Sequence, residues 1–181
     1  MSLTTALVIA LVMIVSTLLF DRGVRPVGRG RVLRPLLVGV PIALFFTAHL
    51  VTGGTGLAVE AAGAVLGLLV GTGAALLARV GRDETTGQAV TRAGTAYFAF
   101  WIAACAARFA FSYGAQHWFG QDMGTWLYGH GVALDDITAV ITNGIVFSVL
   151  GMLLGRAAGM LVRAGTVTRE ATVLGSRTPA L

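Results

Sequence analysis

Five long apolar runs alternate with shorter polar segments along the chain. They cover residues 3–20, 35–52, 57–78, 93–113 and 137–155. A helix needs about 20 mostly apolar residues to cross a bilayer, so each run predicts one spanning helix. Residues 3–20 could also be a secretory signal peptide, but they lack a basic leader and arginines follow them, so we interpret them as a retained helix. We expect an all-α polytopic transmembrane bundle of five helices over residues 1–165 and a disordered tail over 166–181.

Arginine is distributed unevenly among the polar segments. The segments after the second and fourth runs contain no arginine, whereas those after the first, third and fifth runs contain Arg22, Arg25, Arg29, Arg31, Arg34, Arg79, Arg82, Arg92, Arg163, Arg169 and Arg177. Arginine and lysine are enriched on the cytoplasmic side of membrane proteins. The alternation therefore predicts a multi-pass protein of the cytoplasmic membrane, with the N-terminus outside and the C-terminus and tail in the cytoplasm.

The composition supports a lipid environment. Hydrophobic residues make up 56% of the 181 residues and charged residues 12%, about half the charged share of a soluble domain. The net charge of +5 would suggest nucleic acid in a soluble protein. Here the arginines lie mainly between apolar runs, so we expect the lipid bilayer and no nucleic acid as the partner. The single cysteine, Cys105, excludes an internal disulfide.

The first basic segment also carries a family resemblance. Its sequence "RPVGRGRVLRPLL", residues 25–37, resembles the CcdC-like family of small bacterial integral membrane proteins. The resemblance implies a bacterial membrane protein and a link by name to cytochrome c maturation, but it transfers no catalytic residue. The chain also lacks the cysteine pair that thiol chemistry in such maturation would require. The same arginines could instead serve only as an anchor at the inner leaflet.

Glycines recur every four residues in two of the runs. They are Gly63, Gly67 and Gly71 in the third run and Gly151, Gly155 and Gly159 in the fifth, where Gly144 and Ser148 extend the stripe. Small residues at this spacing allow the backbones of membrane helices to approach closely. The pattern predicts either packing of these two helices within the chain or a homodimer face.

Three ionisable residues lie inside the runs. Counted at 1.5 Å per residue from the outer ends of their runs, Glu60 and His49 lie about 5 Å deep and Arg108 about 7 Å deep. Charge within a membrane is costly and is usually paired or functional. We therefore expect Glu60 to pair with Arg108 near His49, with Asp136 and Asn143 approaching from the fifth run. The cluster could be a structural ion pair, or Arg108 could instead extend to the outer membrane surface. The alternative is a ligand or proton site that opens to the outside.

Arg108 shares a helical face with a partly polar stripe. At spacings of three, four, seven, eight and eleven residues, the stripe contains Tyr97, Trp101, Cys105, Ser112 and Gln116. This spacing predicts that the stripe faces the interior of the bundle. At the inner end of the fifth run, Arg156 and Arg163 are expected to reach anionic headgroups.

The segment between the fourth and fifth runs is rich in aromatic residues, which favour the membrane interface. It predicts a short amphipathic helix on the outer surface. The side chains with metal-binding chemistry match no ligand spacing, so we expect no metal; they are His117, Asp122, His130, Asp135 and Asp136. Haem held by His49 and His117 is an alternative.

No nucleophile elbow, zincin motif, phosphate loop or cysteine pair is present, which favours a non-enzymatic role without a cofactor. The sequence favours an accessory, assembly or structural membrane protein with a buried polar cluster, working with a membrane-protein partner or as a homo-oligomer. One alternative is a small transporter or channel that handles protons or anions with Glu60 and Arg108. A further alternative is an intramembrane redox or haem-binding protein.

Overall fold

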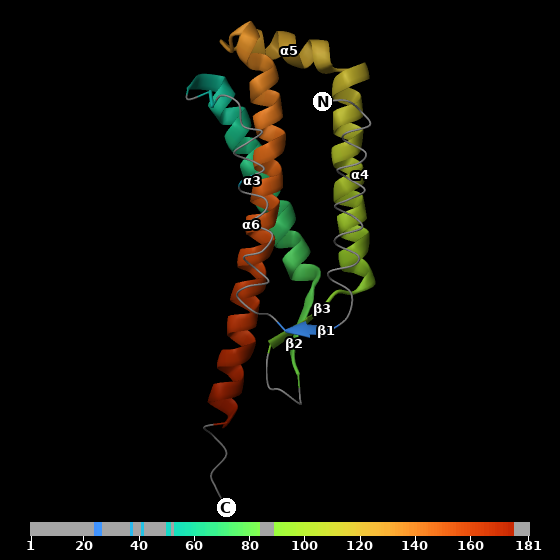
Figure 1. Ribbon diagram of the computed structural model, residues 1–181, viewed down its shortest axis with the longest axis vertical. Helices are drawn as coiled ribbons and strands as arrows, with labels where there is room; N and C mark the ends of the chain where they lie inside the picture. Colours follow the sequence, from blue (N-terminus) through green and yellow to red (C-terminus); the bar gives the residue numbers. More distant parts are fainter. Residues whose placement is uncertain are drawn as a thin grey trace, which may run out of the picture.

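The computed structural model describes residues 24–26, 37, 41, 50–51, 53–83 and 89–175 (Figure 1). The predicted span at 3–20 and most of that at 35–52 lie outside these residues. The described elements, in chain order, are strand β1 (Val24–Pro26), helix α3 (Gly54–Leu77), strands β2 (Arg79–Arg82) and β3 (Ala89–Arg92), and helices α4 (Thr95–His117), α5 (Gly120–Gly129) and α6 (Leu134–Gly175).

The described part of the chain is mostly helical, as the apolar runs predicted. Three of its helices are long and apolar enough to cross a membrane: Gly54–Leu77, Thr95–His117 and the Leu134–Val167 part of α6. They correspond to the third, fourth and fifth predicted spans. The first two predicted spans stay predictions, because the described residues do not cover them.

The three long helices run between two ends of the molecule. α3 and α6 cross each other and run in the same direction, while α4 runs in the opposite direction and stands to one side (Figure 1). α5 lies across the end at which α4 finishes and α6 begins. The strands lie at the other end; β1 precedes α3 in the chain, and β2 and β3 lie between α3 and α4. We call these the α5 end and the sheet end.

α3 and α6 are in close backbone contact through the predicted glycines. A Cβ atom at Gly63, Gly67 or Gly71 would overlap the backbone of Gly144, Ser148 or Met152, respectively. Glycine costs about 1 kcal/mol relative to alanine inside a helix, so local preference disfavours these residues. The close approach accounts for them, because only a hydrogen atom fits between the two backbones.

The glycines of α6 make the reciprocal contacts. A Cβ atom at Gly151 would overlap the carbonyl of Ala64, and one at Gly155 would overlap that of Leu68. At Gly159 it would lie 2.6 Å from the Cβ atom of Ala75. Both glycine stripes therefore belong to one interface inside this chain, which we call the glycine seam.

A small sheet joins two arginine-rich segments, which the all-α expectation did not include. Its order is β1-β3-β2 and both pairings are antiparallel. Val24 of β1 and Arg79 of β2 both lie opposite Arg92 of β3. The sheet thus holds the first and third basic segments at the same end of the molecule.

Two helices extend beyond the predicted spans. α4 continues to His117, past the predicted end at 113, and α6 continues to Gly175. Each apolar run ends where polar residues begin, but α4 and α6 continue as helices through those polar residues. α6 therefore enters the segment 166–181 that we expected to be a disordered tail, and residues 176–181 lie outside the described part.

We expect Gly67→Ala to lower the free energy of unfolding by about 1–3 kcal/mol, because the added methyl group overpacks the seam. Gly129→Ala is the matched control, since open space surrounds that position in α5. Thermal or denaturant unfolding in detergent measures both variants. Equal stability of the two variants would contradict the close contact.

Candidate functional site

The carboxyl group of Glu60 is buried between α3 and α6. Its side chain is 1% exposed, as is that of Asn143 on α6. The amide Nδ2 of Asn143 donates a hydrogen bond of 2.8 Å to Glu60 Oε1. Glu60 precedes Gly63 and Asn143 precedes Gly144, where the backbones of the two helices meet. The glycine seam therefore brings this carboxyl group and this amide together.

The second carboxyl oxygen of Glu60 is also buried. Oε2 has no hydrogen-bond partner among the residues that the structure describes. A buried polar atom without a partner costs about 1–3 kcal/mol, and such atoms call for a physical explanation. Oε2 is thus an acceptor in the interior that Asn143 does not satisfy.

Arg108 binds α6 at a different level. Its Nη2 group donates a hydrogen bond to Ser148 Oγ, and the hydroxyl group of Ser148 donates in turn to the carbonyl of Ile145 at 2.7 Å. Ser148 lies five residues after Asn143, which is about 7.5 Å along the helix axis. The direct Glu60–Arg108 pair that we expected is not among the hydrogen bonds of either side chain.

The helix ends explain why the two charges lie at different levels. α4 ends at His117, so Arg108 is nine residues, or about 14 Å, from the α5 end. α3 begins at Gly54, so Glu60 is six residues, or about 9 Å, from that end. The sequence estimate used the ends of the apolar runs, which placed both residues nearly equally deep.

The first part of the predicted stripe on α4 faces inward, whereas Ser112 is half-buried and Gln116 is exposed. Tyr97, Trp101 and Cys105 are buried and pack with Ala74, Ala78 and Met152. The guanidinium carbon of Arg156 lies 5.7 Å from the ring centroids of both Tyr97 and Trp101, a cation–π distance. Arginines on α4 and on α6 therefore both lie at the α4–α6 interface.

Arg163 acts at the end of α3, although we expected it to reach lipid headgroups. Its Nη1 group donates to the carbonyls of Ala75, Leu76 and Ala78, at 2.7, 2.9 and 2.5 Å. The last carbonyls of a helix have no partner within it and carry partial negative charge. A guanidinium group from α6 supplies both the donor and the charge, a contact that the local sequence does not reveal.

The other candidate residues lie apart from these contacts. Asp136 is in the first turn of α6, seven residues or about 10 Å from Asn143. His49 lies outside the described residues. The ring nitrogens of His117 and His130 contact the carbonyls of Tyr113 and Trp126 in their own helical turns. Among the residues described, no group of three or more histidine, cysteine or acidic residues could hold a metal ion.

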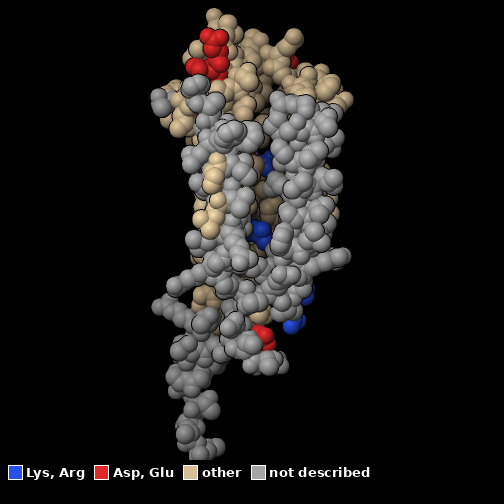
Figure 2. Space-filling model, viewed as in Figure 1, with Lys and Arg blue, Asp and Glu red and all other residues tan. Residues whose placement is uncertain are grey.

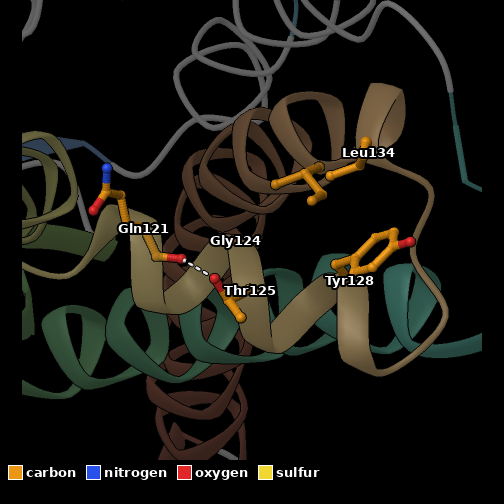
Figure 3. A pocket seen from close by; sticks show the side chains of 6 residues that line it. Gln121, Gly124, Thr125, Tyr128 and Leu134 are labelled. Atoms are coloured by element: carbon orange, nitrogen blue, oxygen red, sulfur yellow. Dashed lines mark hydrogen bonds between the residues drawn. The ribbon is translucent and has the colours of Figure 1, made fainter.

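A pocket opens at the α5 end, where the sequence predicted an interfacial helix. Its volume is about 430 Å³, and the lining residues are Gln121, Gly124, Thr125, Tyr128, Leu134 and Ile137. Figure 3 shows Leu134 at the start of α6 next to Tyr128 of α5, with Gln121 and Thr125 along α5. The Thr125 hydroxyl group donates to the carbonyl of Gln121 at 2.9 Å. The pocket does not include Glu60 or Arg108.

We expect Asn143→Leu to lower stability by about 1–3 kcal/mol, because it removes the hydrogen bond to Glu60 Oε1. The double variant Glu60→Leu/Asn143→Leu should regain most of that loss, since replacing both partners by apolar groups can be nearly neutral. A double-mutant cycle of unfolding in detergent measures the coupling. Additive losses would mean that the contact does not contribute to stability.

Comparison with known proteins does not extend this description. Scans against protein-family models, curated proteins and solved structures found no match. The resemblance of residues 25–37 to the CcdC-like family stays a prediction. The function is therefore inferred from this chain's own chemistry: a buried carboxyl group held by an amide, and a guanidinium group held by a hydroxyl group.

Proposed function

We propose that the chain is an accessory or assembly protein of a bacterial cytoplasmic membrane, which it crosses five times. One observation carries the proposal: the polar side chains of the interior bind neighbouring helices. Glu60 binds Asn143, Arg108 binds Ser148, and Arg163 binds the end of α3. These contacts fix the register of three helices, which suits a protein whose role is to present a stable apolar surface to a partner.

The outer faces of the helices support this role. The exposed large apolar side chains of α3, α4 and α6 include Leu66, Leu69, Leu76, Ile102 and Val162. Such faces must be covered by lipid or by apolar surfaces of other helices. A partner membrane protein or further copies of this chain would pack against part of them.

The charge distribution supports the proposed orientation. The sheet joins basic segments at one end, while Asp122, Asp135 and Asp136 belong to α5 and the start of α6 at the other. By the positive-inside rule, the sheet end faces the cytoplasm. β1 lies at the sheet end, whereas Val51 packs with Leu127 and Val140 at the α5 end. β1 and Val51 therefore lie at opposite ends of the molecule, which supports the proposed second spanning segment between them.

Proton handling is a second candidate function. The observation that favours it is the buried Oε2 atom of Glu60, which has no partner among the described residues. A carboxyl group inside a membrane is a functional candidate by default. Exchange of a proton at this oxygen would require access from one side of the membrane.

We expect the tagged protein, purified from its native membrane in mild detergent, to elute as a complex larger than one chain, with fixed stoichiometry. Light scattering with mass spectrometry identifies the members. The Glu60→Leu/Asn143→Leu variant should keep the complex, because assembly uses the helix surfaces and not the carboxyl group.

A different outcome would contradict the assembly role. In that outcome the protein is a single chain that dissipates a proton gradient in proteoliposomes, and Glu60→Gln loses this activity while Asp136→Asn keeps it. That result would favour proton handling. Glu60→Gln removes the buried carboxyl group that contacts Asn143, whereas Asp136→Asn removes a carboxyl group at the α5 end.

A further inference from the structure

We propose that the α4–α6 interface binds a monovalent anion of the carboxylate class, with Arg108 as the binding residue. The ligand is either a small soluble carboxylate or the head of a fatty acid, which share the same chemistry at the guanidinium group. This binding site goes beyond the proposed assembly role and does not depend on it.

Among the described residues, Arg108 has no carboxylate as a hydrogen-bond partner. Across the five apolar runs of the full sequence, Glu60 is the only acidic residue, and His49 and Arg108 are the only basic ones. Glu60 binds Asn143, whose level on α6 is about 7.5 Å from that of Ser148. The partner of Arg108 is the neutral hydroxyl group of Ser148. An arginine at this depth is costly without a counter-ion, so an external anion would relieve a cost that the protein otherwise bears.

The guanidinium group retains donors for such a ligand. Arginine has five N–H donors in a planar fork. The hydrogen bond to Ser148 uses one of them, and no second hydrogen-bond partner of Arg108 is found among the described residues. Ser148 accepts that bond because its own hydrogen is directed to the carbonyl of Ile145. The two oxygen atoms of a carboxylate match two parallel donors of the fork, whereas a halide ion does not use this geometry.

A second cation increases the positive charge of the same interface. Arg156 lies eight residues after Ser148, about 12 Å further along α6, over the rings of Tyr97 and Trp101. Figure 2 shows basic atoms at two heights along the middle of the molecule. With one guanidinium group at the proposed site and the next about 12 Å away, a monovalent anion balances the local charge better than a divalent one.

The test uses the full-length protein purified in a non-ionic detergent. Thermal unfolding is followed with sodium acetate, sodium laurate, sodium chloride and sodium phosphate at matched ionic strength and neutral pH. A ligand that binds only the folded protein raises the unfolding temperature in proportion to RT ln(1 + [L]/Kd). We expect a saturable increase with acetate or laurate that exceeds the increase with chloride or phosphate.

Two variants and one control assign the effect to Arg108. Arg108→Gln should fold, because the Gln amide can still donate to Ser148 and a partly buried charge is removed. It should bind acetate or laurate at least about ten-fold more weakly, since a charge-assisted pair is lost. Arg108→Lys keeps the charge without the fork and should lie between the two. Arg79→Gln, an exposed arginine of the sheet, should bind like the unchanged protein.

The outcomes separate the possible ligands. A response to acetate identifies a soluble carboxylate, and a response to laurate alone identifies a fatty acid supplied by the bilayer. An equal response to chloride or a stronger one to phosphate would overturn the carboxylate assignment. The absence of any saturable increase, or one unchanged in both Arg108 variants, would overturn the site itself.

Discussion

The close contact between α3 and α6 is the constraint on which the rest of this structure depends. Apolar helices gain little free energy from the hydrophobic effect when they associate in lipid, because lipid tails are as apolar as the helix side chains. Backbone approach at glycine provides the packing instead, and successive turns of α3 meet successive turns of α6 through Gly63, Gly67 and Gly71. Once this register is set, the levels of Asn143 and Ser148 on α6 are also set.

Those two residues decide how the interior charges are used. Asn143 donates a hydrogen bond to the carboxyl group of Glu60. Ser148, about 7.5 Å further along α6, accepts one from the guanidinium group of Arg108. An acid and a base that could have neutralised each other are therefore each held by a neutral group. This separation stabilises the bundle through contacts between helices, and Arg108 is left with a neutral hydroxyl group as its hydrogen-bond partner.

The sequence predicted what is local and periodic. The four-residue glycine spacing indicated the seam, and the stripe of Tyr97, Trp101 and Cys105 indicated the inner face of α4, because both patterns follow from helix geometry alone. The contacts of Arg163 with the end of α3, and the pairing of β1 with β3, join segments far apart in the chain, so no local pattern predicts them. The level of Arg108 was misjudged because hydropathy marks where polar residues begin, whereas α4 continues to His117.

Disulfide cross-linking in native membranes tests the central claim most directly, using a Cys105→Ala background. A Cβ atom at Gly144 would lie 3.9 Å from Cγ1 of Val59, so Val59→Cys and Gly144→Cys are close enough to form a disulfide under mild oxidation. Leu66→Cys with Gly144→Cys is the control, because Leu66 is 61% exposed and lies about 10 Å further along α3 than Val59. The account predicts rapid cross-linking of the first pair within one chain and none of the second. Cross-linking of the second pair without the first would contradict it.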